Sequence, residues 1–216
     1  MPKSTALIFG ASSEIGTWII DGLRDQGIYS VCLSRKALNR NIDFGDYDEI
    51  LKLIKECQAK YKNIKSVYFC IGKYTCSQIS ESHPKSWISD VMVNLGYAYI
   101  CYRSICDAFK NCSSEIRFVF LGSTASVSKP PEYSSYAVSK GGLEMLTTYI
   151  NNEPPINIRA CLLRLGTCKT NFSNSKSKSN VIRKEDVVQT VNYLENIGFH
   201  VFPDLVSLRP IRRATE

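Results

Sequence analysis

Short apolar runs rich in β-branched residues recur along the chain, and each is short enough to be one strand. They cover residues 6–9, 29–33, 66–70, 118–121, 156–163 and, with a weaker pattern, 200–208. Between them lie segments whose apolar residues recur at helical spacing, at residues 14–26, 47–61, 85–109, 136–151 and 184–196. Because strands alternate with helices, we predict an α/β fold, a doubly wound parallel sheet with helices on both faces in three α/β/α layers.

Two other segments add to this pattern. Residues 39–44 are typical of one more short strand, which a connection too short for a crossover helix of usual length joins to Arg35. Residues 170–180 are rich in Ser, Asn and Lys, and form either a plain surface loop or a mobile lid at the carboxyl side of a central strand. With 216 residues and no internal repeat, we predict a single domain over residues 1–216.

The balance of charge bears on possible partners. The chain has 27 Lys and Arg against 20 Asp and Glu, a net charge of +7, but the basic residues are scattered, and the densest cluster lies at 209–213 in the C-terminal tail. Because no nucleic-acid-binding motif accompanies the charge, we expect no nucleic-acid partner. The apolar run at 6–9 is too short for a signal peptide, and no stretch approaches the ~20 apolar residues of a membrane span. We therefore expect a cytoplasmic protein without a membrane partner.

Nine cysteines could indicate a disulfide scaffold, but a chain of this length with strand and helix patterns does not need such staples. We expect them to be reduced core residues. No two of them form a C-x-x-C pair, and the only histidines are His83 and His200. The ligand spacing of a zinc site is therefore missing, and we predict no metal.

A glycine-containing turn follows the first strand directly and opens the first helix. Glycine permits a tight turn and a close backbone approach, while the free N–H groups and the positive end of the helix favour phosphate oxygens. An ordinary strand-to-helix turn uses the same residues, but here a full βαβ unit follows. We therefore predict that this turn binds the pyrophosphate of a dinucleotide, through Gly10, Ser12, Ser13, Ile15 and Gly16.

The end of the second strand bears on which dinucleotide is bound. An acidic residue there would hydrogen-bond the ribose hydroxyls of NAD, whereas a cation would accommodate the extra phosphate of NADP. This chain has Ser34, Arg35 and Lys36. A guanidinium can hold a phosphate at two points and no carboxylate competes, so NADP(H) is favoured and NAD(H) stays the alternative. A merely solvated strand end would have the same residues.

The motif Tyr-x-x-x-Lys occurs at Tyr136 with Lys140, and also at Tyr61 with Lys65. With 12 tyrosines in the chain, about one match is expected by chance. The two matches differ in their surroundings, because Ser123 comes at the end of the strand that precedes Tyr136, and Tyr61 has no such neighbour. We therefore predict that Tyr136 and Lys140, and not Tyr61 and Lys65, form the catalytic pair.

These residue types suit proton transfer to and from an oxygen. Positions four apart lie on one face of a helix, so the ammonium of Lys140 can approach the oxygen of Tyr136. Joined by the positive nicotinamide of the oxidised cofactor, it would lower the pKa of Tyr136 from about 10. Tyr136 would then serve as general acid in a reduction and as general base in an oxidation. Ser123 would donate a hydrogen bond to the substrate oxygen.

In this order and spacing, from residue 4 to about residue 208, the motifs resemble those of the short-chain dehydrogenase/reductase family, whose fold is of the Rossmann type. The glycine loop of that family reads Thr-Gly-x-x-x-Gly-x-Gly, and here Phe9 and Glu14 replace the threonine and the middle glycine. A side chain that points outward from the helix start would be tolerated at Glu14.

The resemblance implies further site residues. Asn94 matches the asparagine that interrupts a long helix and holds a proton-relay water; the alternative is an exposed helix residue. Tyr136 and Lys140 are both implied to contact the cofactor, and Lys140 is implied to hydrogen-bond its nicotinamide ribose. The other implied cofactor contacts are Asp43 and Phe44 at the adenine ring, Gly72 after the third strand, and Gly166 and Thr170 after the fifth.

The resemblance implies an NADP(H)-dependent oxidoreductase that interconverts an alcohol and a ketone or aldehyde by hydride transfer. The alternative is an inactive NAD(P)-binding sensor or scaffold on the same fold, against which the intact Asn94, Ser123, Tyr136 and Lys140 argue. A sugar-nucleotide epimerase or dehydratase would need a larger C-terminal substrate domain.

The expected partner is a small carbonyl or alcohol substrate. The predicted pocket wall comprises Lys73, Tyr74, residues 129–133 and the loop at 176–178, a mixture compatible with a polar or anionic compound. The resemblance also implies a homodimer or homotetramer that pairs through the helices carrying Asn94 and Lys140. Apolar residues on those helices are either interface or core, namely Tyr97, Ile100, Leu143 and Leu146.

Overall fold

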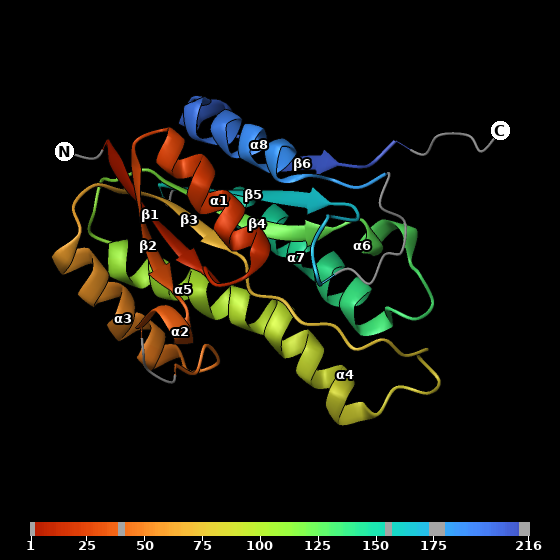
Figure 1. Cartoon of the computed structure of the whole chain (residues 1–216). Helices are drawn as coiled ribbons and strands as arrows, with labels where there is room; N and C mark the ends of the chain where they lie inside the picture. The colour runs from red at the N-terminus through yellow and green to blue at the C-terminus, as the bar shows by residue number, and fades with distance from the viewer. Residues whose placement is uncertain (1–2, 39–41, 154–156, 173–179, 212–216) are drawn as a thin grey trace.

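The computed structural model describes residues 3–38, 42–153, 157–172 and 180–211. Six parallel strands form one sheet in the order β2-β1-β3-β4-β5-β6 (Figure 1). The strands are β1 (Ser4–Phe9), β2 (Ile28–Leu33), β3 (Ile64–Phe69), β4 (Ile116–Ser123), β5 (Ile158–Leu165) and β6 (Leu205–Leu208).

Helices cover both faces of the sheet, which confirms the predicted three-layer fold (Figure 1). One face is covered by α1 (Glu14–Asp25) and α8 (Lys184–Asn196). The other is covered by α3 (Tyr47–Lys60), α5 (Tyr97–Phe109) and α7 (Ser134–Asn152). Helix α4 (Pro84–Val91) continues through a π-helical turn, η1 (Met92–Gly96), into α5. Short helices complete the chain, namely α2 (Arg35–Leu38), α6 (Ala125–Ser128) and η2 (Phe199–Val201).

The sequence pattern of the strands explains the layers. Strand β1 is buried along Thr5 to Phe9, because side chains on both faces of a parallel sheet meet helices. Alternate residues of the strand belong to the two cores, with Leu7 and Phe9 on the α3–α5–α7 side and Ala6 and Ile8 on the α1–α8 side. The near-continuous apolar runs therefore reflect a sheet that helices cover on both faces.

The strand order fixes where a ligand can bind. The chain runs from β1 outward to β2, and then crosses back over β1 to β3, so the winding direction reverses between β1 and β3. Ligands of open α/β sheets bind at such a reversal, outside the carboxyl ends of the strands. The turn from Gly10 to Gly16 lies at that point, immediately after β1.

The predicted strand at residues 39–44 is wrong over the part that the structure describes, because 42–44 are not in a strand. The apolar character of that segment instead serves the core, where Ile42 and Phe44 are buried. Before it, α2 forms a single helical turn, whose start Ser34 caps by accepting a hydrogen bond from the N–H of Ala37 (3.1 Å).

Other boundaries also differ from the prediction. The helix expected at 85–109 is one α–π–α run, and the weak strand at 200–208 is confined to β6, after a short 3-10 turn. Of the predicted loop or lid at 170–180, residues 173–179 lie outside the described residues. None of the described helices is long and apolar enough to cross a membrane.

The cysteines are all free, and six of the nine are buried, in agreement with the expected reduced core residues. Cys76 and Cys112 are exposed and Cys32 is partly buried. Among the described residues, no group of His, Cys, Asp and Glu side chains could hold a metal ion.

Candidate active site

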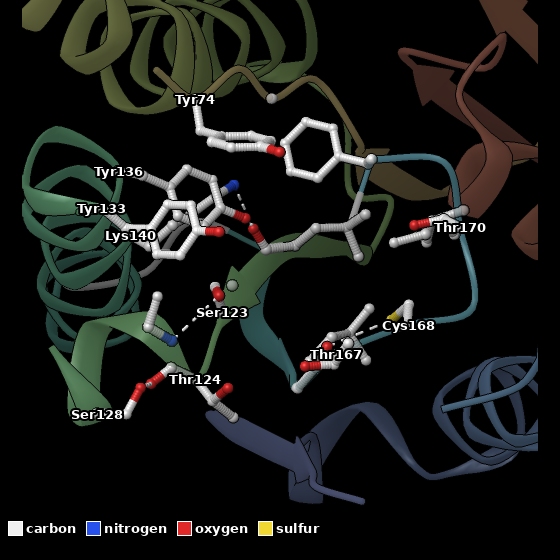
Figure 2. A pocket seen from close by; sticks show the side chains of 18 of the residues that line it. Tyr74, Ser123, Thr124, Ser128, Tyr133, Tyr136, Lys140, Thr167, Cys168 and Thr170 are labelled. Carbon is white, nitrogen blue, oxygen red and sulfur yellow. Dashed lines mark hydrogen bonds between the residues drawn. The ribbon is translucent and has the colours of Figure 1, made fainter. Parts of the chain in front are cut away.

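A cavity of ≈ 850 Å³ opens at the carboxyl ends of the strands, between the start of α1 and the start of α7 (Figure 2). Its lining includes eight of the residues predicted from the sequence, namely Ser13, Ile15, Gly72, Ser123, Tyr136, Lys140, Gly166 and Thr170. They come from segments that follow β1, β3, β4 and β5. The fold therefore brings the expected pyrophosphate turn and the expected catalytic group to one cavity.

The turn after β1 is built for close backbone approach. Gly10 has φ +77°, and a Cβ atom there would lie 2.8 Å from the main-chain carbon of Cys70. A Cβ at Gly16 would lie 2.7 Å from the carbonyl oxygen of Gly10. Both positions therefore require glycine. Ser13 caps α1 by accepting a hydrogen bond from the N–H of Gly16 (3.0 Å), and it lines the cavity beside the positive end of the helix.

Glu14 stands where the family has a glycine; its side chain is exposed, but it lines the cavity and does not simply point outward from the helix start. Its carboxylate accepts a hydrogen bond from the main-chain N–H of Asn171 (2.7 Å) and one from the side-chain amide of Asn171 (3.5 Å). The start of α1 is thereby tied to the segment that follows β5, across one end of the cavity. No sequence pattern indicates this link.

The end of β2 lies beside this turn, because the N–H of Gly10 donates a hydrogen bond to the carbonyl of Leu33 (3.0 Å). Arg35 is exposed there, outside the lining of the cavity. Ser34 is buried, and its hydroxyl oxygen accepts the hydrogen bond that caps α2, so the hydroxyl can still donate its hydrogen to another group.

Two residues that the resemblance assigned to the adenine end have other contacts. The ring of Phe44 is in the core, edge-on to Phe9 at 6.2 Å between ring centres. The carboxylate of Asp43 accepts a hydrogen bond from the N–H of Gly45 (2.8 Å). Neither lines the cavity, and Ser12, Gly10 and Gly16 do not line it either.

Tyr136 and Lys140 lie one turn apart on α7, as the motif predicts, and both face the cavity (Figure 2). The ammonium of Lys140 lies 5.5 Å from the ring centre of Tyr136. It also donates a hydrogen bond to the carbonyl of Leu121 (2.7 Å), while the residue is only 3% exposed. A buried cation is therefore anchored beneath the phenol.

Burial raises the pKa of Tyr136 to about 12, while a hydrogen bond with Ser123 acts in the opposite direction. Burial lowers the pKa of Lys140 to about 8. Lys140 therefore does not bring the pKa of Tyr136 below its usual value of about 10. Desolvation dominates for both groups, so at neutral pH the tyrosine is a phenol and Lys140 is still mostly charged.

Ser123 ends β4 and reaches the same cavity (Figure 2). Its oxygen accepts a hydrogen bond from the N–H of Ala125 (3.2 Å), which orients the side chain at the start of α6. Strand β4 thus supplies the serine, and α7 supplies the tyrosine and lysine.

Asn94 is fully buried in the π-helical turn, so the alternative of an exposed helix residue is wrong. Its amide nitrogen donates to the carbonyls of Lys73 (2.6 Å) and Asp90 (2.8 Å), and its oxygen accepts from the N–H of Lys73 (3.0 Å). The side chain thereby fixes the segment that follows β3, next to Gly72. A Cβ at Gly72 would come 3.4 Å from the Asn94 oxygen and 3.9 Å from the Lys140 ammonium nitrogen.

Asp90 is a residue that sequence reasoning missed. It is fully buried, and its carboxylate accepts hydrogen bonds from the N–H of Thr75 (2.7 Å) and the hydroxyl of Ser135 (2.9 Å). Lys73 lies 3.3 Å away as its ion-pair partner. A carboxylate four residues before Asn94, on the helix face that Asn94 also uses, was the available sequence signal.

The predicted pocket wall is confirmed in part. Tyr74, Pro130 and Tyr133 line the cavity, whereas the other members of 129–133 do not. Lys73 turns to Asp90 and Ser89 and is not part of the lining either. The predicted loop lysines at 176 and 178 lie outside the described residues. Phe172, which was not singled out from the sequence, also lines the cavity.

Comparison with known proteins agrees with this geometry. A family model described as short chain dehydrogenase matches residues 4–181. An uncharacterized oxidoreductase of Staphylococcus saprophyticus subsp. saprophyticus is 21% identical over 232 residues, which cover 98% of this chain and 99% of the relative. Chanoclavine-I dehydrogenase of Penicillium roqueforti is 27% identical over 180 residues, which cover 70% of this chain and 69% of the relative.

Solved structures share the fold. An alcohol dehydrogenase from the archaeon Thermococcus sibiricus, complexed with 5-hydroxy-NADP, has a TM-score of 0.85 at 19% identity, covering 99% of each chain. A 3-ketoacyl-(acyl-carrier-protein) reductase from Brucella melitensis, complexed with NADH, has a TM-score of 0.84 at 17% identity, covering 96% of each chain. With the family model matched over most of its length, the chain belongs to the short-chain dehydrogenase family.

Proposed function

We propose that the protein is an NADP(H)-dependent oxidoreductase that interconverts an alcohol and a ketone or aldehyde, with Tyr136 as general acid and base. The observation that carries the proposal is that Tyr136, Lys140 and Ser123 line the same cavity as the start of α1. Family membership supports an oxidoreductase, and the glycine turn fits the pyrophosphate of a nicotinamide dinucleotide. When bound, that cofactor would donate or accept the hydride.

In carbonyl reduction, Tyr136 donates its proton to the substrate oxygen. Because burial keeps the phenol protonated at neutral pH, the tyrosine starts this direction in the required form. Ser123 donates a hydrogen bond to the same oxygen and stabilises the charge that develops there. The ammonium of Lys140, held by the Leu121 carbonyl, stabilises the phenolate that remains.

Asn94 takes a supporting part in this proposal. Its amide makes three hydrogen bonds that hold the main chain at Lys73, which fixes Gly72 at the floor of the cavity. Asn94 therefore positions the segment after β3, whereas Tyr136 and Ser123 contact the reacting oxygen of the substrate.

NADP(H) is preferred over NAD(H) in this proposal because of Arg35. It is exposed at the carboxyl end of β2, next to the glycine turn, and residues 34–38 contain no carboxylate. A guanidinium there can bind the 2′-phosphate that distinguishes NADP. The two solved structures named above carry an NADP derivative and NADH, so the comparison favours neither.

Self-association through α5 and α7 is part of the same proposal. Of the residues first considered for it, Leu143 is buried, and Tyr97, Ile100 and Leu146 pack against the core. Other large apolar side chains on these helices are exposed, among them Tyr99, Met145 and Tyr149. Sedimentation velocity should give a dimer or tetramer. A monomer at micromolar concentration would contradict the proposed self-association.

The test of the proposed function is the oxidation of NADPH in the presence of a panel of aldehydes and ketones. Wild type should reduce at least one of them, and Tyr136→Phe should lower kcat by about 10²- to 10⁴-fold. Tyr61→Phe is the matched control, because it belongs to the other Tyr-x-x-x-Lys match and should keep full activity. A fully active Tyr136→Phe would show that Tyr136 is not the general acid, whereas a protein that binds NADPH but reduces none of the panel would favour a sensor or scaffold.

A further inference from the structure

Four aromatic rings from three separate segments converge at the mouth of the cavity. Tyr74 comes from the segment after β3, Tyr133 and Tyr136 from the start of α7, and Phe172 from the segment after β5. The ring centre of Tyr74 lies 5.4 Å from that of Tyr133, 6.1 Å from that of Tyr136 and 4.8 Å from that of Phe172, with the planes steeply inclined in each pair. These are the distances and angles of edge-to-face contacts.

Tyr74 is the centre of this cluster and is held in place from behind. The neighbouring residue, Thr75, is bound through both its N–H and its hydroxyl to the buried carboxylate of Asp90. The preceding residue, Lys73, is bound on its main chain by Asn94. The main chain on both sides of Tyr74 is therefore held by hydrogen bonds, and the ring of Tyr74 packs against the ring of Tyr136.

Phe172 is the least secured member of the cluster. Its side chain is 45% exposed although it lies at the cavity, and its ring contacts are with Tyr74 and, at 6.1 Å, with Tyr136. It shows that a benzene ring fits against Tyr74 directly beside the phenol of Tyr136. A substrate must occupy that region to bring its oxygen to Tyr136.

Of the cations expected at this wall, Lys73 and Lys129 do not line the cavity, and those at 176 and 178 lie outside the described residues. The ammonium of Lys73 is turned to Asp90 and Ser89, away from the cavity lining. Arg209 does line the cavity, but it is exposed and comes from the end of β6, on the side of Gly166. Among the described residues, the part of the wall that Tyr74, Tyr133 and Phe172 form beside Tyr136 is therefore aromatic.

We propose that this cluster binds an aromatic ring of the substrate, so that the substrates are aldehydes and ketones carrying an aryl group near the carbonyl. The substrate ring takes the place of Phe172 against Tyr74, while its carbonyl oxygen faces Tyr136 and Ser123. This inference rests on the proposed function and adds the substrate class to it.

Phenylacetone and cyclohexylacetone test this class. Both are methyl ketones with a six-membered ring one carbon away from the carbonyl, and they differ in that only the ring of phenylacetone is aromatic. Wild type should favour phenylacetone in kcat/KM by roughly 2- to 10-fold, the value of one good edge-to-face contact. Tyr74→Leu should bring this ratio close to one, since leucine keeps apolar volume but has no ring. Phe172→Leu should leave the ratio unchanged or raise it, because it removes the competing ring.

Tyr193→Leu is the matched control, an exposed tyrosine on α8 that is not part of the cavity lining, and it should keep the wild-type ratio. A ratio near one in wild type, or a ratio that survives in Tyr74→Leu, would overturn the inference. If wild type reduces no carbonyl compound at all, the proposed function has failed, and calorimetric binding of the two ketones to the protein with NADPH still decides. Tighter binding of phenylacetone would uphold the aromatic site, and equal or absent binding would reject it.

Discussion

The hydroxyl of Ser135 donates a hydrogen bond to the buried carboxylate of Asp90, with 2.9 Å between the oxygens. Ser135 directly precedes Tyr136 on α7, whereas Asp90 belongs to α4. Since the same carboxylate also accepts from Thr75, one side chain joins the three segments that carry Asn94, Tyr74 and Tyr136. The geometry of the site therefore depends on a residue that does not line the cavity.

Replacing Asp90 by asparagine should disturb both stability and turnover. The amide removes the charge that faces Lys73 and offers N–H groups to partners that are themselves donors, so we expect a loss of about 2 kcal/mol in the free energy of unfolding. We also expect a fall in kcat with an unchanged Kd for the cofactor, because the Asp90 side chain contacts Thr75, Ser135 and Lys73 rather than the turn after β1. Urea unfolding and steady-state kinetics measure the two effects.

Asp21→Asn is the control for that experiment. Asp21 pairs on the surface with Arg24 and Lys184, and the loss of such exposed ion pairs costs less than about 1 kcal/mol. An Asp90→Asn variant that is no less stable and no slower than Asp21→Asn would show that the network does not position the site.

Glu14→Gln should strengthen cofactor binding. Its carboxylate lies at the start of α1, beside the predicted pyrophosphate position, and repels a negative ligand. Glutamine can keep accepting the hydrogen bond from the N–H of Asn171 while removing the charge. We expect the Kd for NADPH to fall by about 2- to 5-fold in low salt and by less at 0.5 M NaCl. Glu185→Gln, in the first turn of α8, is the control, and weaker NADPH binding by Glu14→Gln would refute the idea.

Lys140 makes the stability of the folded protein depend on pH. Its pKa is about 8 in the folded protein and about 10.4 in an unfolded chain, so burying the charge costs free energy at neutral pH, and this cost disappears as pH rises from 8 to 10.4. Relative to Lys140→Met, which cannot titrate, the wild type should gain up to about 3 kcal/mol between pH 7 and pH 10.5. Chemical denaturation of both proteins at each pH gives the difference. An equal difference at the two pH values would mean that Lys140 is not desolvated.

The sequence was sufficient for the fold and for the relative placement of Tyr136 and Lys140 because both depend on local patterns. Apolar runs mark strands buried on both faces, and a four-residue spacing on a helix places Lys140 beneath Tyr136 whatever the rest of the chain does. The same reasoning failed at residues 42–44, where buried apolar side chains pack on the core without a strand. Periodicity records which side chains are buried, and not which backbone buries them.

The contacts that set the site could not be predicted, because they join residues far apart in the chain. Glu14 meets Asn171, and Asp90 meets Ser135, only after the strands have been ordered into a sheet. Likewise, Lys73 looked like a pocket cation until its partner Asp90 was seen. The raised pKa of Tyr136 could not be predicted for the same reason, since burial is a property of the packed fold.

Arg35→Ala should abolish a preference for NADPH. Because Arg35 is an exposed cation at the end of β2, its loss should weaken NADPH binding by about 10-fold or more and leave NADH binding nearly unchanged. Lys85→Ala, at the start of α4, removes an exposed cation elsewhere and should affect neither nucleotide. An equal loss for both nucleotides would assign Arg35 to general support of the fold.

The most direct test of the account is titration of the purified wild-type protein with NADPH and with NADH, following the fluorescence of the reduced nicotinamide. The structure predicts that both nucleotides bind at the cavity that Tyr136 lines and that NADPH binds more tightly. The measurement needs no knowledge of the substrate. Binding of neither nucleotide would contradict the oxidoreductase function itself.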